Sequence, residues 1–231
     1  MLKCSSYPDM KPRFTYQRNR ALTFIEVLVI ILCLAVLAAI ILPMLAAAKH
    51  RNSRINCVSN LKQINLALRI WEGDNNNEYP MQVAVTNGGG KEWIETGDIA
   101  ACFRAASNEL STTRILICPL DTDHTYATNF QTDFNNSHIS YFLCPNASES
   151  YPQMILSGDD NLAVNGTPVP PGILNITNCS AISWTKARHG GIGNLAFADG
   201  SVAEESSSGF QNALQYATNG TPFMTKRLAI P

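Results

Sequence analysis

Three residues near the C-terminus have the side-chain types of a hydrolytic triad: His189, Asp199 and Ser201. In such a triad the histidine takes a proton from the serine hydroxyl, and the carboxylate orients the imidazole ring. Asp199-Gly200 is also a strong hairpin signal between two apolar runs, so Asp199 and Ser201 are expected at a hairpin tip. The chain lacks the Gly-x-Ser-x-Gly elbow that presents a nucleophilic serine. We therefore expect a structural role for His189 and no enzyme activity.

Acidic residues in two turns suggest metal chemistry. Asp159 and Asp160 are followed by Asn161, and Asp199 lies in the expected hairpin. Carboxylate and amide oxygens are ligands that Ca²⁺ takes, together with backbone carbonyls. These residues therefore predict a calcium site of Asp159, Asp160 and Asp199. The alternative is that they are solvated carboxylates of ordinary turns.

The chain has seven cysteines, and five of them lie beyond the apolar segment described below: Cys57, Cys102, Cys118, Cys144 and Cys179. No Cys-x-x-Cys spacing is present, which disfavours a zinc site. Disulfides are stable in an oxidising compartment. Cys118 and Cys144 each close a short apolar run and precede a proline, so we expect a bridge between them.

The chain divides by charge into three segments. Residues 1–21 carry five basic residues against Asp9 alone, residues 22–48 carry only Glu26, and residues 55–231 carry 9 basic and 16 acidic residues. About 20 apolar residues cross a bilayer, and basic residues before them favour a cytoplasmic N-terminus. A removable signal peptide has a shorter apolar core. The pattern predicts a single-pass membrane protein, and the net charge of −1 argues against nucleic-acid binding.

An amphipathic helical pattern follows the apolar segment, with apolar residues every three or four positions: Ile55, Val58, Leu61, Ile64, Leu68 and Trp71. Residues 73–77 favour turns and end the pattern. We expect one helix over residues 22–72, with a transmembrane half at 22–48. Pro43 predicts a kink within it. Glu26 places a carboxylate in hydrocarbon, so it needs either water at the membrane edge or a cation of a neighbouring subunit.

Residues 21–26, Ala-Leu-Thr-Phe-Ile-Glu, resemble the type IV prepilin motif, in which a small residue precedes Phe-Thr-Leu-Ile-Glu. Ala21 and Leu22 replace the usual Gly and Phe, and Pro43 stands where many pilins carry proline. The resemblance implies that a prepilin peptidase cuts between Ala21 and Leu22 and methylates the new amine of Leu22. It also implies that Glu26 offsets the positive N-terminus of an adjacent subunit during assembly.

A second resemblance lies near the C-terminus. His189, nine further residues and then Asp199-Gly200 are similar to a segment of bacterial prepilin-like proteins, and residues 157–161 resemble a companion segment. The chain looks closer to the pseudopilins of type II secretion than to adhesive pilins. Major pseudopilins bind calcium in a C-terminal loop, which adds to the calcium prediction above.

Residues 73–231 form the expected globular ectodomain. Short apolar runs predict strands at 115–117, 141–143, 153–156, 181–184, 194–198 and 201–204. Asp199-Gly200 predicts a primed turn, with positive φ at both central residues. The expected fold is α+β and pilin-like, with the long N-terminal helix packed on a small antiparallel sheet.

These resemblances imply a structural subunit of a type II secretion pseudopilus or a type IV-like filament. It would lie in the inner membrane with its C-terminal domain in the periplasm. The implied partners are the prepilin peptidase, other pilin or pseudopilin subunits, an inner-membrane assembly platform and the lipid bilayer. The alternative is a membrane-tethered extracytoplasmic binding protein that uses the pilin anchor only for export. A requirement for Glu26 in assembly separates the two.

Overall fold

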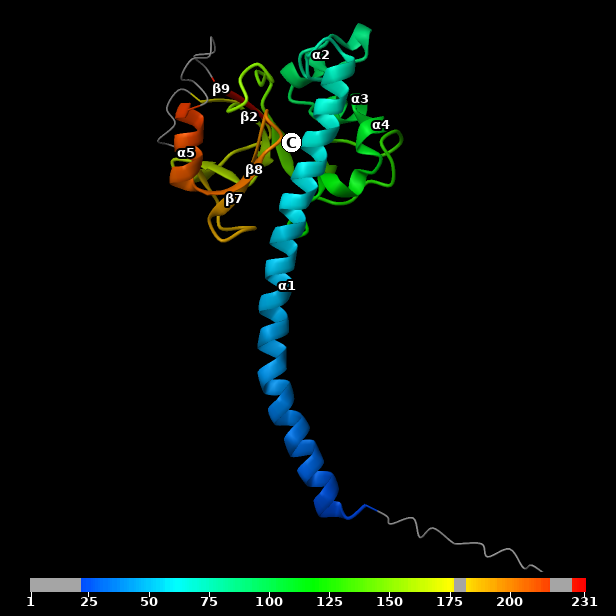
Figure 1. Cartoon of the computed structure of the whole chain (residues 1–231), viewed down its shortest axis with the longest axis vertical. Coiled ribbons are helices and arrows are strands. Elements are labelled where there is room, and N and C mark those ends of the chain that lie inside the picture. The colour runs from blue at the N-terminus through cyan, green and yellow to red at the C-terminus, as the bar shows by residue number, and fades with distance from the viewer. Residues whose placement is uncertain (1–21, 177–181, 217–225) are drawn as a thin grey trace, which may run out of the picture. The chain divides into compact units, whose positions relative to one another are not determined.

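The computed structural model describes residues 22–176, 182–216 and 226–231 (Figure 1). The predicted leader 1–21, including Ala21, and also Cys179 lie outside the described residues. The chain separates into two compact units, one ending at Ala47 and the other spanning Ala48–Pro231. Helices and antiparallel strands together make the fold α+β, as predicted.

Helix α1 runs over Phe24–Asp74 as one element, close to the predicted residues 22–72. Its segment Phe24–Leu45 is long and apolar enough to cross a membrane, and none of that segment is buried. Pro43 lies inside the helix. Because proline has no N–H, the carbonyl four residues earlier lacks its helical partner there.

The C-terminal half of α1 has one buried face. Its buried positions step by four, three, four and three residues: Cys57, Leu61, Ile64, Leu68 and Trp71. Ile55, which was predicted on this face, is 58% exposed. At 3.6 residues per turn, Ile55 lies about 120° around the helix from Leu61, whereas Cys57 lies about 40° away. A cysteine therefore takes the first buried position of the stripe.

The ectodomain contains two antiparallel sheets. The larger has the order β5-β9-β1-β2-β7-β8, and the smaller has the order β4-β3-β6. The strands of the larger sheet are β1 (Tyr141–Leu143), β2 (Ile155–Asp159), β5 (Gly172–Ile176), β7 (Ile192–Phe197), β8 (Val202–Ser206) and β9 (Lys226–Ile230). Those of the smaller sheet are β3 (Leu162–Val164), β4 (Thr167–Pro168) and β6 (Ile182–Trp184).

Helices cover both faces of the central strands (Figure 1). Consecutive residues of a strand point to opposite faces. In β1, the hydroxyl of Tyr141 lies 3.4 Å from the sulfur of Cys57 in α1. The ring of Phe142 stacks on Phe210 of α5 (Ser207–Tyr216) on the other side. The sheet is therefore packed between α1 and α5.

The short helices α2, α3 and α4 lie beside the C-terminal half of α1, on the side away from the sheet (Figure 1), and three 3₁₀ turns belong to the same stretch of chain. They are η1 (Val85–Asn87), α2 (Lys91–Glu95), α3 (Ala100–Ala105), α4 (Ser107–Leu110), η2 (Thr113–Leu116) and η3 (Asn136–His138). The prediction of a strand at 115–117 is wrong, because most of that run belongs to η2. Thr112 caps this 3₁₀ turn by accepting a hydrogen bond from the N–H of Arg114. A short buried apolar run does not by itself distinguish a strand from a helical turn.

The hairpin predicted around Asp199-Gly200 is confirmed, since β7 and β8 pair antiparallel. Its turn differs from the prediction. The N–H of Gly200 donates to the carbonyl of Phe197 at 3.0 Å, and the N–H of Phe197 donates to the carbonyl of Ser201 at 2.9 Å. Gly200 has φ +93°, whereas Asp199 is not among the residues with positive φ. This is a three-residue loop closed by a left-handed glycine rather than a two-residue primed turn.

Glu72, near the end of α1, is the most buried acid on that helix, with 1% of its surface exposed. Burial, together with a hydrogen bond that protonated Glu72 donates to Glu149, raises the pKa of Glu72 to about 7. Arg69 forms an ion pair with Glu149. Buried Glu72 therefore lies next to a partly exposed ion pair.

Glu72→Gln tests this arrangement. The pKa of Glu72 is higher in the folded state than in the unfolded state. The contribution of protonated Glu72 to stability is therefore complete below the unfolded pKa and is lost as the pH rises through about 7. The difference in melting temperature between the variant and the wild type should therefore depend on pH. We expect this difference to be more favourable to the variant at pH 8 than at pH 5, by on the order of 5 °C. The measurement is thermal unfolding of the detergent-purified chain. Glu78→Gln, at an exposed position, is the control. The same offset at both pH values would contradict the assignment.

Candidate functional site

At the start of α1, the carboxylate of Glu26 is hydrogen-bonded within its own chain. Its Oε2 accepts from the N–H and from the hydroxyl of Thr23, both at 2.8 Å, while Thr23 Oγ1 accepts from the N–H of Glu26 at 3.3 Å. This reciprocal pair is a capping box. Thr23 is thus a hydrogen-bond partner of Glu26 within its own chain, in addition to the water or the neighbouring cation considered in the sequence analysis. The spacing Thr-x-x-Glu was visible in the sequence. Leu22, just before the box, is exposed.

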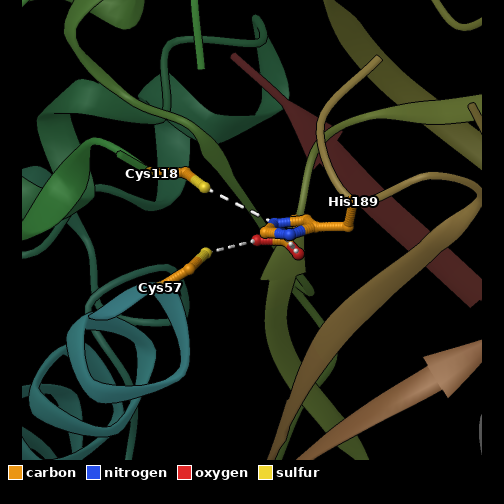
Figure 2. A group of neighbouring side chains, drawn as sticks. Cys57, Cys118 and His189 are labelled. Carbon is orange, nitrogen blue, oxygen red and sulfur yellow. Dashed lines mark hydrogen bonds and ion pairs between the residues drawn. The ribbon is translucent and has the colours of Figure 1, made fainter. Parts of the chain in front are cut away.

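Four buried side chains converge in the ectodomain: Cys57, Cys118, Asp159 and His189. Their ligand atoms all lie within 4.8 Å of one another. The sulfur of Cys118 is 3.4 Å from Nε2 of His189, and the sulfur of Cys57 is 3.3 Å from Oδ1 of Asp159. Nε2 of His189 is 3.3 Å from Oδ2 of Asp159. Figure 2 shows both sulfurs pointing toward the imidazole ring and a carboxylate.

A different element positions each of these side chains. Cys57 is the first buried residue of the α1 stripe, and Cys118 follows η2. Asp159 ends β2, and His189 lies in the turn before β7. Gly190 and Gly191 follow His189 with φ +72° and +94°, a backbone conformation that side chains disfavour. The two glycines thus allow the tight turn that carries the imidazole inward.

Neighbouring residues hold the carboxylate of Asp159 in place. The N–H of Asn194 and its side-chain amide donate to Oδ2 of Asp159 at 2.8 and 2.9 Å. The amide nitrogen of Asn194 also lies 3.6 Å from the sulfur of Cys57. Such supporting hydrogen bonds fix the orientation of ligating groups.

A second buried cluster, centred on Arg188, lies next to the first. The guanidinium pairs with Asp121 at 2.7 Å and with Asp160, and these three side chains are 0 to 6% exposed. The hydroxyl of Ser140 donates to Asp121 at 2.6 Å. His124 lies 2.8 Å from the same carboxylate of Asp121. We call this group the Arg188 network.

Three segments contribute to both the Cys/Asp/His cluster and the ion pairs of Arg188. They carry Cys118 with Asp121, Asp159 with Asp160, and His189 with Arg188. The ion pairs of the network therefore also hold three of the four cluster residues close together.

Hydrogen bonds within the cluster shift its pKa values in different directions. The hydrogen bond with Cys57 lowers the pKa of the Cys118 thiol to about 6 against the effect of burial, and His189 adds to this lowering. The same contact with Cys118, together with burial, raises the pKa of Cys57. Burial lowers the pKa of His189, but Asp159 and Cys118 outweigh it and raise that pKa to about 9. A low thiol pKa favours the thiolate, which is the form that binds metals and attacks electrophiles.

The cluster does not have the geometry of a catalytic triad. In a triad, the nucleophile and the carboxylate contact different nitrogens of the histidine. Here Cys118 and Asp159 both face Nε2 of His189, while its Nδ1 has no hydrogen-bond partner among the described residues. The side chains of His189 and Asp159 are fully buried, and Cys118 is 0% exposed. The sulfur of Cys118 is therefore not exposed to solvent in this structure.

The residues of the predicted calcium site are not brought together. Asp159 belongs to the Cys/Asp/His cluster, and Asp160 pairs with Arg188. Asp199 lies in the β7–β8 turn, where its Oδ1 accepts from the N–H of Ser201 at 2.8 Å. The geometry gives no support to a calcium site of these three carboxylates, and it does not join His189 to Asp199 and Ser201 as a triad.

The predicted bridge between Cys118 and Cys144 is not formed, because Cys118 is a free thiol in this structure and faces His189. Cys57 and His189 were not predicted as its neighbours, since the four cluster residues are far apart in the chain and have no short metal-binding spacing. The position of Cys57 four residues before Leu61 was the available signal that it belongs to the buried face.

Arg188→Met tests the Arg188 network. Removing the guanidinium leaves Asp121 and Asp160 buried without their cation. We expect the free energy of unfolding to fall by about 3–5 kcal/mol. The matched control is Arg54→Met, which breaks a pair with Glu204 in which both side chains are more than a third exposed. That loss should be at most about 1 kcal/mol. Urea unfolding in detergent measures both, and equal losses would contradict a buried network.

Comparison of the chain with family models, with curated proteins and with solved structures gives no match in any of the three. A functional conclusion therefore depends on the chemistry and geometry of the chain's own residues. Those residues form two distinct features: a capped apolar helix segment and a buried cluster of metal-ligand types.

Proposed function

We propose that the chain is a pilin-like structural subunit, anchored in the inner membrane by the apolar half of α1, that assembles with similar subunits into a pseudopilus or filament. The observation that carries the proposal is the segment Phe24–Leu45, none of which is buried in the chain. An apolar surface of this size needs a cover, which lipid or the equivalent helices of other subunits provide.

The ectodomain does not use this segment for its own core. The buried apolar residues that form that core begin at Cys57 in α1 and continue through the strands and helices that follow. The apolar half of α1 therefore contributes no residues to the hydrophobic core of the ectodomain. This supports a role in anchoring and in contact with other helices.

Glu26 favours assembly over anchoring alone. The capping box with Thr23 accounts for the hydrogen bonds of its carboxylate, but the box does not require a charge, because glutamine also occupies this position in capping boxes. A charge in hydrocarbon costs a few kcal/mol unless a partner offsets it. The amine that cleavage creates on Leu22 of an adjoining subunit is such a partner. The resemblance to the prepilin motif implies the same pairing.

The first prediction of this proposal concerns processing. We expect the protein in the membrane to begin at a methylated Leu22, because the motif implies cleavage after Ala21. Mass spectrometry of the N-terminal peptide measures both changes. Protein that retains residues 1–21 in cells with an active prepilin peptidase would contradict the proposal.

The second prediction concerns assembly. Glu26→Gln removes the charge and keeps the capping box. We expect the variant to insert, to be cleaved and to fold, but to form about tenfold fewer cross-linked oligomers in membranes, the equivalent of about 1.4 kcal/mol per contact. The measurement is chemical cross-linking of membrane fractions at equal expression.

Thr23→Ala is the matched control, because it removes the hydroxyl of the capping box and keeps the charge. Its oligomer ladder should be close to wild type. If Glu26→Gln also forms a wild-type ladder, assembly does not depend on the charge, and a tethered binding protein is the better description. If Thr23→Ala loses the ladder as severely as Glu26→Gln, the effect belongs to helix capping.

A further inference from the structure

We infer that Cys57, Cys118, Asp159 and His189 form a structural binding site for a thiophilic divalent cation, and that Zn²⁺ fits it best. Two sulfurs, one imidazole nitrogen and one carboxylate are the ligand types that zinc takes, and four of them complete its tetrahedral shell. The inference concerns the ectodomain and stands apart from the proposed assembly function.

The separations between the ligand atoms fit side chains arranged around one ion. With Zn–S near 2.3 Å and Zn–N near 2.0 Å, neighbouring ligand atoms of a zinc tetrahedron are about 3.3–3.8 Å apart. The sulfur of Cys118 is 3.4 Å from Nε2 of His189, and the two oxygens of Asp159 lie 3.3 Å from the sulfur of Cys57 (Oδ1) and 3.3 Å from Nε2 of His189 (Oδ2). All four ligand atoms lie within 4.8 Å of one another, so small side-chain movements bring them into a zinc shell. A direct charge-assisted hydrogen bond between His189 and Asp159 would be about 2.7–2.9 Å. The observed 3.3 Å is longer, as expected for two ligands that face a common point.

The approach of two side chains to the same nitrogen of His189 also supports a metal site. Cys118 and Asp159 both approach Nε2 of His189, so a cation at the centre of the cluster would meet the lone pair of that nitrogen. As ligands, two thiolates and a carboxylate carry three negative charges in a buried volume. A dication offsets two of them, which reduces the cost of burying these groups together.

Surrounding residues prepare the site. Asn194 fixes the carboxylate of Asp159, and the Arg188 network holds the segments that carry Cys118, Asp159 and His189. All four positions of a tetrahedral shell are filled by protein, which is typical of structural rather than catalytic zinc. Ca²⁺ is a poor fit, because it takes six to eight oxygen ligands and this cluster offers one carboxylate.

Such a site would join α1 to the rest of the ectodomain. Cys57 comes from the helix, whereas the other three ligands come from the sheet and its connecting segments. Binding of a structural zinc contributes directly to folding free energy. We therefore expect the packing of the C-terminal half of α1 to be stronger when the metal is bound.

The test uses the full-length protein, purified in detergent, reduced, stripped with a chelator and then titrated with Zn²⁺ or Co²⁺. We expect one Zn²⁺ per chain by elemental analysis and a rise in melting temperature on the order of 10 °C at saturating metal. The Co²⁺ form should show the strong visible absorption of tetrahedral cobalt and a thiolate-to-cobalt charge-transfer band.

Cys57→Ser and Cys118→Ser each remove one sulfur ligand, and we expect Zn²⁺ affinity to fall at least about 100-fold in each. Cys102→Ser is the matched control, because Cys102 is equally buried but contacts the carbonyl of Gly90. It should bind Zn²⁺ as wild type does.

Three results would overturn the inference. The first is wild-type protein whose Co²⁺ form lacks the thiolate charge-transfer band. The second is Zn²⁺ binding that neither cysteine variant weakens. The third is protein isolated without reductant that contains a Cys57–Cys118 disulfide and no zinc. The cobalt spectrum is recorded on wild-type protein, so the test remains decisive even if a variant does not fold.

Discussion

The contact between α1 and the sheet at Cys57 is the interaction on which the ectodomain depends. Cys57 begins the buried face of the helix and touches Tyr141 and Asp159. Those two residues are cross-strand neighbours in β1 and β2. A slip of either strand by one residue would turn its side chain to the α5 face. Helix docking and strand register are therefore fixed at the same point.

The polar groups at this point are held by paired clusters rather than by isolated bonds. Three segments each contribute one residue to the Cys/Asp/His cluster and one residue to the ion pairs of Arg188. Buried polar networks are stabilising and specific only when their members are satisfied. Within the described part of the chain, Nδ1 of His189 and Oδ1 of Asn194 have no hydrogen-bond partner. A cation at the centre would bind the sulfur, carboxylate and Nε2 ligands together.

Local patterns in the sequence were enough to predict the long helix, the α+β class and the hairpin at Asp199-Gly200, because these depend on residues close in the chain. The buried face of α1 was placed near Ile55 rather than Cys57, since its direction depends on where the sheet lies. The Cys/Asp/His cluster joins four segments that are distant in the chain, so no short spacing of ligand residues in the sequence could predict it. The capping box of Thr23 and Glu26 was predictable from the local spacing Thr-x-x-Glu. In the sequence analysis, the charge of Glu26 in its apolar surroundings was considered, but its hydrogen bonds to Thr23 were not.

X-ray absorption spectroscopy at the zinc edge of the full-length, zinc-loaded protein measures most directly which atoms hold the ion. Coordination by Cys57, Cys118, Asp159 and His189 predicts two sulfur atoms at about 2.3 Å and two nitrogen or oxygen atoms at about 2.0 Å. A shell of nitrogen and oxygen alone would contradict the account, because it would leave both thiols of the cluster outside the metal site.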